Sequence, residues 1–200
     1  MAGPPNILML VGSPRQPSFT RSLARRIERT LSAHGAKVSR LDLYETPLPP
    51  IDLNLRAKRT GHPDPAVAEL FRMAEAADGY VLASPTYHNS YAGVLKNALD
   101  YLTLRDVRYR PVGLAAHSGR STQAVDHLRQ VVRGLLGVSI PTQVCTRDSD
   151  FSDAPGSDGM YEVTDPDILT RIERFAAELV LFAGHMRALR ADMDQPRAAK

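Results

Sequence analysis

One short stretch near the N-terminus constrains the fold of this chain more than any other. Asn6–Val11 is a continuous apolar run that ends at Gly12, which predicts a buried strand of a parallel sheet. A loop with two prolines follows, and the spacing of apolar residues predicts a helix over residues 19–34. The loop therefore joins the carboxyl end of a strand to the start of a helix. Free N–H donors and the helix dipole make such a place favourable for anionic groups.

The side chains of this loop suit a phosphate group. Its hydroxyl and guanidinium donors are Ser13, Arg15, Ser18, Thr20, Arg21 and Ser22. Neither the P-loop pattern nor G-x-G-x-x-G occurs in the sequence. A loop with one glycine and many hydroxyls suits a terminal monophosphate, such as that of FMN, better than a bridging pyrophosphate. The alternative is an ordinary Ser/Thr helix cap with solvated arginines.

The rest of the chain alternates predicted strands and helices. Further strands are expected at residues 37–43, 79–84, 110–117 and 140–146, and helices at 65–77, 122–136 and 166–190, with another before residue 101. This order predicts an α/β three-layer sandwich with a five-stranded parallel sheet of flavodoxin-like order 2-1-3-4-5. Residues 1–190 are expected to form one domain, and the polar tail, residues 191–200, is expected to be disordered.

Two more loops follow strands that end at the same edge of that sheet. The loop after the third strand offers Pro85, Thr86, Tyr87 and His88, and the loop after the fourth offers Ser118, Gly119 and Arg120. An isoalloxazine ring needs a flat apolar wall, backbone partners and positive potential near its pyrimidine edge. Tyr87 could form the wall, Gly119 allows close backbone approach, and Arg120 could supply the charge. The three loops together predict a flavin site.

Two motifs resemble the NAD(P)H-dependent FMN reductase family of flavodoxin-like proteins. They are Gly12-Ser-Pro-Arg-x-x-Ser-x-Thr and Pro85-x-Tyr-x-x-Ser-x-x-Gly-x-Leu-Lys-Asn-x-Leu-Asp100, within a likeness that covers residues 6–146. The resemblance places the FMN phosphate on Ser13, Arg15, Ser18 and Thr20, and the ring and ribityl chain on Pro85, Thr86, Tyr87, His88, Ser118 and Gly119. Many members of this family have Asn at the position of Thr20. Many also have Glu or Val at the position of Thr86.

The resemblance also implies an activity and partners. It implies hydride transfer from NAD(P)H to flavin N5, with no catalytic acid or nucleophile from the protein. The electrons would pass to free flavin, a partner flavin-dependent monooxygenase or a quinone-like compound. It further implies a homodimer or homotetramer. Two alternatives remain: a flavodoxin-type electron carrier, although such carriers are usually acidic, and a flavin-free scaffold that binds partners.

Composition narrows the classes of partner and compartment that remain possible. The net charge of +3 and pI of about 9.2 favour anionic ligands, but the basic residues are scattered, so no nucleic-acid partner is expected. The absence of a long apolar run or signal peptide predicts a cytoplasmic protein without a membrane partner. The single cysteine, Cys145, is expected to be a buried structural thiol.

Several polar residues are assigned no catalytic or metal role. The acidic residues at 148, 150, 153 and 158 lack the spacing of a calcium loop and are expected to form a solvated loop, so no metal site is predicted. His117, at a strand end, is expected to be structural. Lys96 and Asn97 are expected to tie their helix to a neighbouring loop or to face a second subunit.

Overall fold

The structure is a computed structural model that describes residues 3–55 and 58–194. Its strands are β1 (Asn6–Val11), β2 (Lys37–Asp42), β3 (Gly79–Tyr87), β4 (Ser90–Tyr91), β5 (Pro111–His117), β6 (Val138–Ser139) and β7 (Val144–Thr146). Its helices are α1 (Phe19–Ala33), α2 (Pro65–Ala76), α3 (Gly93–Tyr101), α4 (Leu104–Val107), α5 (Gln123–Gly134) and α6 (Pro166–Asp194), with one 3-10 turn, η1 (Asp148–Asp150).

The parallel strands follow the expected order, but the last strand is divided. The sheet runs β2-β1-β3-β5-β6, and β7 pairs with the far end of β5. Pro141, which has no N–H donor, lies between β6 and β7, so the edge strand cannot stay continuous there. β3 also continues to Tyr87, beyond its predicted end, because it forms a short antiparallel hairpin with β4. The prediction of exactly five continuous strands is therefore wrong in detail.

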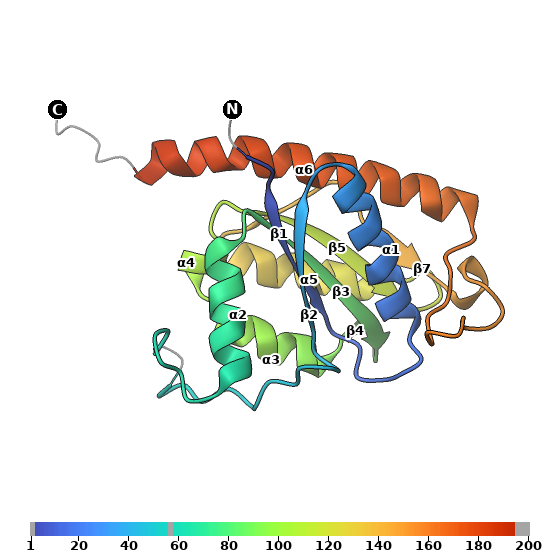
Figure 1. The fold of residues 1–200 in the computed structure, drawn as a ribbon, viewed down its shortest axis with the longest axis horizontal. Helices are drawn as coiled ribbons and strands as arrows, with labels where there is room; N and C mark the ends of the chain where they lie inside the picture. The colour runs from blue at the N-terminus through green and yellow to red at the C-terminus, as the bar shows by residue number, and fades with distance from the viewer. Residues whose placement is uncertain (1–2, 56–57, 195–200) are drawn as a thin grey trace.

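Helices cover both faces of the sheet, as expected for a three-layer α/β sandwich (Figure 1). The alternation along β1 shows the two layers. Ile7, Met9 and Val11 pack in the same core cluster as apolar residues of α1 and α6. Leu8 and Leu10 point the other way and join the cluster that contains residues of α2, α3 and α5. β1 is thus buried on both faces, which explains its continuous apolar sequence.

The ends of β1 and α3 lie in direct contact. A Cβ atom added at Gly12 would lie 2.7 Å from the Cβ of Leu95, closer than such atoms approach one another in proteins. Gly12 also donates its backbone N–H to the carbonyl of Ala83 in β3 at 2.8 Å. This close packing joins the loop after β1 to the segment after β3 at one edge of the sheet.

The long helix α6 lies across the molecule and continues further than expected (Figure 1). It is helical to Asp194, so the predicted disordered tail is wrong for residues 191–194, and residues 195–200 lie outside the described residues. Asp78, just before β3, pairs with Arg190 at 3.0 Å and also with Arg187. These ion pairs hold the second half of α6 against the sheet.

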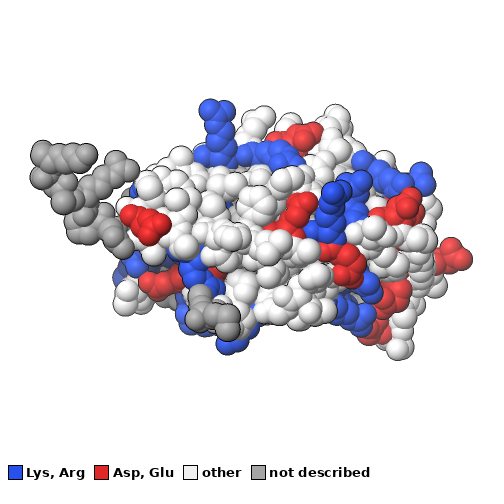
Figure 2. Space-filling view, turned by 90° about the horizontal axis from the view of Figure 1, so that it is seen from above, with Lys and Arg blue, Asp and Glu red and all other residues white. Residues whose placement is uncertain are grey.

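The surface shows mixed charge. In the view of Figure 2, basic and acidic side chains are intermingled, as expected from their scatter along the sequence. Within the described residues, none of the helices is both long enough and apolar enough to cross a membrane.

Candidate functional site

The three predicted loops meet at one cavity. It has a volume of about 180 Å³ and lies beyond the carboxyl ends of β1, β3 and β5. Of the residues predicted from the sequence, it is lined by Ser13, Arg15, Ser18, Thr20, Pro85, Thr86, Tyr87, Ser118 and Gly119. Phe19, His117 and Asp148 line it as well, and sequence reasoning had not placed them there. The parallel topology brings these distant segments together.

The loop after β1 presents hydroxyl groups at the start of α1. Ser18 is the N-cap residue: its Oγ accepts the backbone N–H of Arg21 at 3.2 Å and donates to Ser13 Oγ at 2.7 Å. Thr20 is buried beside them, whereas Arg15 is exposed at the rim. The first N–H groups of a helix have no partner within it, so this end of α1 adds donors for an anion.

Two predicted residues of this loop lie elsewhere. The guanidinium of Arg21 is 1% exposed and pairs with Asp42 at the end of β2, with Nε 2.7 Å from the carboxylate. A buried charge needs such a partner, so Arg21 ties α1 to β2 and does not line the cavity. Ser22 Oγ donates to the carbonyl of Ser18 at 2.9 Å and accepts the N–H of Tyr161 at 3.0 Å.

The end of β3 forms one wall of the cavity. Tyr87 is 42% exposed, so its ring is open to a ligand. The next two residues, His88 and Asn89, have φ angles of 48° and 62° and form the tight turn to β4. His88 is exposed on this turn and does not line the cavity.

Thr86 supplies a test of whether FMN fits this cavity. Its Oγ1 atom is buried and has no hydrogen-bond partner among the described residues. A buried hydroxyl without a partner is unfavourable and rare in folded proteins. FMN carries carbonyl, ring-nitrogen and ribityl groups that can supply the missing partner. The hydroxyl donors of the first loop suit the phosphate of that cofactor, and the unpartnered hydroxyl of Thr86 is consistent with a polar ligand beside the end of β3.

The turn after β5 is held by one carbonyl group. The backbone N–H groups of Ser118 and Arg120 both donate to the carbonyl oxygen of Thr146, at 2.9 and 3.2 Å. Gly119, between them, has a φ of 51°, a left-handed conformation that glycine adopts without strain. At Gly119 the turn thus presents backbone, without a side chain, to the cavity.

The side chain of Arg120 leaves the cavity. Its guanidinium lies 2.7 Å from Asp150 and 2.6 Å from Asp165. Asp150 is fully buried, so the expectation of a solvated acidic loop is wrong for this residue. Burial alone would raise the pKa of Asp150, but hydrogen bonds from Arg120 and the N–H of Arg147 hold this pKa below its usual value. Arg120 therefore fixes the loop before α6 and is no free cation at the cavity.

His117 is the main lining residue that the sequence did not indicate. Its ring packs against that of Phe19 in a tilted arrangement, with centroids 4.7 Å apart, and its Nε2 lies 3.1 Å from Asp148. Burial lowers the pKa of His117, although Asp148 opposes that shift, so burial favours the neutral form of the ring. The one available signal was the position of His117 at a strand end, and that position predicted a structural role.

The second motif contains residues with structural contacts. Asn97 donates to the carbonyl of Pro49 at 2.8 Å and accepts the N–H of Ile51 at 3.0 Å. This confirms that it ties α3 to a neighbouring loop. Lys96 pairs with Asp100 along the same helix at 2.6 Å. Among the residues that the structure describes, no cluster of His, Cys, Asp and Glu could hold a metal ion.

The parallel sheet and the cavity beyond its strand ends define a flavodoxin-like flavoprotein. The chain belongs to the NADPH-dependent FMN reductase family, whose model matches residues 5–150. It is thus an NAD(P)H-dependent oxidoreductase with FMN as its cofactor. The chain is 37% identical over 180 residues to the FMN-dependent NADPH-azoreductase of Staphylococcus aureus, which covers 89% of this chain and 95% of the relative.

Solved structures support the fold. An oxidoreductase from Corynebacterium diphtheriae superposes with a TM-score of 0.67 and 23% identity, over 92% of this chain and 99% of the other. FerB, an NAD(P)H:acceptor oxidoreductase from Paracoccus denitrificans, superposes with a TM-score of 0.71 and 20% identity. The superposition covers 91% of this chain and 98% of FerB. At this identity the likeness establishes the flavodoxin-like architecture.

Proposed function

We propose that this protein is an FMN-containing reductase that uses NADPH to reduce small aromatic acceptors, with azo compounds and quinones as the acceptor class. The observation that supports it best is the meeting of the three loops at one cavity, which is lined in part by Thr86, a residue whose buried hydroxyl has no partner among the described residues. The azoreductase relative favours an azo acceptor. When bound, FMN supplies the two-electron chemistry by accepting a hydride at N5.

The lining residues have distinct roles in this proposal. Ser13, Ser18, Thr20 and Arg15 bind the phosphate, since they present hydroxyl and guanidinium donors at the start of α1. A hydroxyl at Thr86 donates to the cofactor, and Tyr87 and Gly119 flank its ring. We leave out Arg21, Ser22, His88 and Arg120, because none of them lines the cavity with a free side chain.

Anaerobic mixing of the FMN-loaded protein with NADPH tests the reaction. We expect the oxidised flavin absorption to disappear rapidly and to return when an azo dye or a quinone is added. A flavodoxin-type electron carrier would bind FMN but would not be bleached by NADPH. A flavin-free scaffold would show no FMN affinity in a titration. Either result would refute the proposal.

Steady-state NADPH oxidation distinguishes the acceptors. An azo dye, a quinone and free FMN are supplied separately to the holoprotein. Turnover with the dye or quinone alone supports the proposal. Turnover only with added free FMN would instead indicate a reductase that releases reduced flavin, which is what a partner monooxygenase would need. A homodimer or homotetramer is also proposed, and sedimentation or light scattering measures it.

Arg15 provides a direct test of the phosphate site. We expect Arg15→Ala to weaken FMN binding by about 1.5–3 kcal/mol, because charged hydrogen bonds to the phosphate are lost. This corresponds to roughly 10- to 150-fold in Kd. Arg29→Ala is the matched control, since Arg29 lies half-exposed on α1 away from the cavity. Equal affinity in both variants would remove Arg15 from the site.

A further inference from the structure

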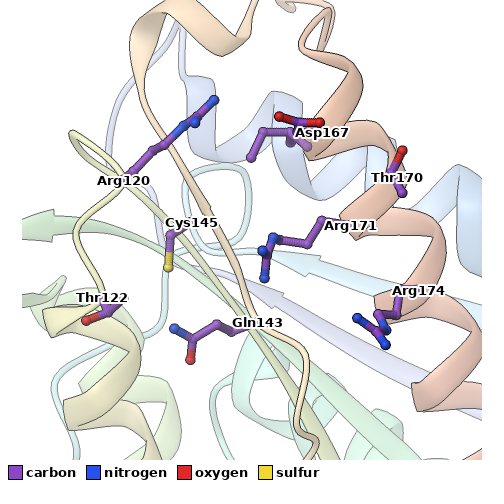
Figure 3. A pocket seen from close by; sticks show the side chains of 9 residues that line it. Arg120, Thr122, Gln143, Cys145, Asp167, Thr170, Arg171 and Arg174 are labelled. Atoms are coloured by element: carbon purple, nitrogen blue, oxygen red, sulfur yellow. The ribbon is translucent and has the colours of Figure 1, made fainter.

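A second and larger cavity lies beside the flavin site. It has a volume of about 700 Å³ and opens between β7, the start of α5 and the first half of α6 (Figure 3). Its wall mixes apolar and polar surface, and the polar or charged side chains that the argument uses are Arg120, Gln143, Arg171 and Arg174. Its volume is in the usual range for small-molecule sites.

One turn of backbone separates the two cavities. Gly119 lines the flavin cavity, and the next residue, Arg120, lines the larger one. Consecutive Cα atoms are about 3.8 Å apart. Cys145 lines the larger cavity, and its neighbour Thr146 holds the turn through its carbonyl. An extended ligand in the larger cavity could therefore reach the flavin site across this turn.

Two exposed arginines of α6 lie at the edge of the larger cavity, and few carboxylates compensate their charge. Arg171 and Arg174 extend from α6 towards the cavity in Figure 3. Arg171 forms no ion pair within the described part of the chain. The carboxylate paired with Arg174, Glu178, is 3.7 Å away and already accepts a hydrogen bond from Thr142 at 2.7 Å. Asp167 is the one carboxylate among the lining residues. The wall on the α6 side therefore favours an anion.

We propose that the larger cavity binds the phosphate-bearing adenosine half of NADPH, with Arg171 and Arg174 on the 2′-phosphate. The nicotinamide half then reaches the flavin site over the turn at Gly119. Guanidinium groups bind phosphates through paired hydrogen bonds, and the side-chain amide N–H group of Gln143, whose oxygen accepts from Arg129, adds a neutral donor. NADH lacks the 2′-phosphate, so these two arginines set the preference for NADPH. The inference rests on the proposed use of this donor.

Thiol protection tests occupancy without any turnover. Cys145 is the single cysteine of the chain and lines the cavity, and burial raises its pKa to about 11. Labelling by a maleimide at alkaline pH is followed by mass spectrometry on the FMN-loaded protein. We expect saturating adenosine 2′,5′-bisphosphate to slow labelling several-fold, and adenosine 5′-monophosphate to do so less. Unchanged labelling with the bisphosphate would overturn the inference.

Charge-removal variants test the role of the two arginines. We expect the double variant Arg171→Gln/Arg174→Gln to lose the protection of Cys145 by the bisphosphate. Its KM for NADPH should rise on the order of 10-fold or more, because charged hydrogen bonds to the phosphate are lost. The KM for NADH, kcat and the FMN affinity should stay unchanged. Arg133→Gln, at an exposed position near the end of α5 and away from this cavity, is the control and should behave as the wild type.

Two outcomes separate this inference from the proposed function. Protection that depends on the arginines, without NADPH oxidation, would support the site and refute the reductase. NADPH oxidation with a KM unaffected by the double variant would refute the site and leave the reductase intact. An equal rise in KM for NADH and NADPH would also overturn the assignment, since the 2′-phosphate would then play no part.

Discussion

Replacing Thr86 by valine should have opposite effects on stability and on FMN binding. The Thr86 hydroxyl is buried without a partner, which costs about 1–3 kcal/mol in the protein without FMN. Valine has nearly the same shape and no hydroxyl. We therefore expect Thr86→Val to stabilise the FMN-free protein by up to that amount. A chain of 200 residues should then show a rise in Tm of roughly 2–4 °C per kcal/mol.

The same substitution should weaken FMN binding. If the cofactor supplies the missing partner, the wild type recovers about 1–3 kcal/mol on binding, and Thr86→Val cannot. This predicts a Kd for FMN that is higher by roughly 5- to 150-fold. Flavin fluorescence titration measures the Kd, and thermal unfolding of the FMN-free protein measures the stability.

The matched control is Thr86→Ser, which keeps the hydroxyl and loses a methyl group. It should retain FMN affinity within a few-fold and should not raise the Tm. An unchanged Kd in Thr86→Val, together with a lower Tm, would show that the hydroxyl neither meets the cofactor nor lacks a partner in solution. That result would refute the reasoning.

Two further predictions concern stability. Gly113→Ala should destabilise the protein by about 1–3 kcal/mol, because its Cβ would lie 2.3 Å from the ring of Phe175 in α6; Gly134→Ala, with open space around it, should be neutral or slightly stabilising in the same urea unfolding assay. Asp150 has a lowered pKa when folded, so its ion pair with Arg120 stabilises the protein above the unfolded pKa of about 4, and this contribution is lost as the pH falls through the lower folded value. Asp150→Asn should reduce stability at pH 7 and should make the urea midpoint depend less on pH in the acid range. If the midpoint fell with pH in the same way in both proteins, the Asp150–Arg120 ion pair would not contribute to acid unfolding.

The sequence indicated the architecture because the signals of a parallel α/β sheet are local. The apolar run of β1 and the periodicity of α1 each identify an element without knowledge of the rest. Strand order and the edge at which loops meet then follow from general rules of topology. The division of the last strand was missed, since its cause is a single residue, Pro141, whose effect depends on its place at the sheet edge.

The sequence predicted which backbone segments meet at the candidate site. It did not predict the directions in which individual side chains point. Ser18 and Thr20 line the cavity, whereas Arg21, from the same segment, turns towards Asp42. The sequence near Arg21 contains nothing that identifies this partner, which lies on a different strand. Likewise, Arg120 was expected beside the flavin ring but meets the buried Asp150. Long charged side chains form ion pairs with residues that are distant in the sequence, so these partners can be identified only in the folded structure.

The anchoring of the Ser118–Arg120 turn on Thr146 has a consequence for how this protein could diverge. Thr146 is the last residue of the short edge strand β7, and the segment after it provides Asp150 and Asp165, which form ion pairs with Arg120. Changes in residues 149–165 would therefore alter the position of this turn while leaving in place every side chain that lines the cavity. Exchanging residues 149–165 between homologues is therefore a way to change acceptor specificity while the residues that line the cavity stay the same.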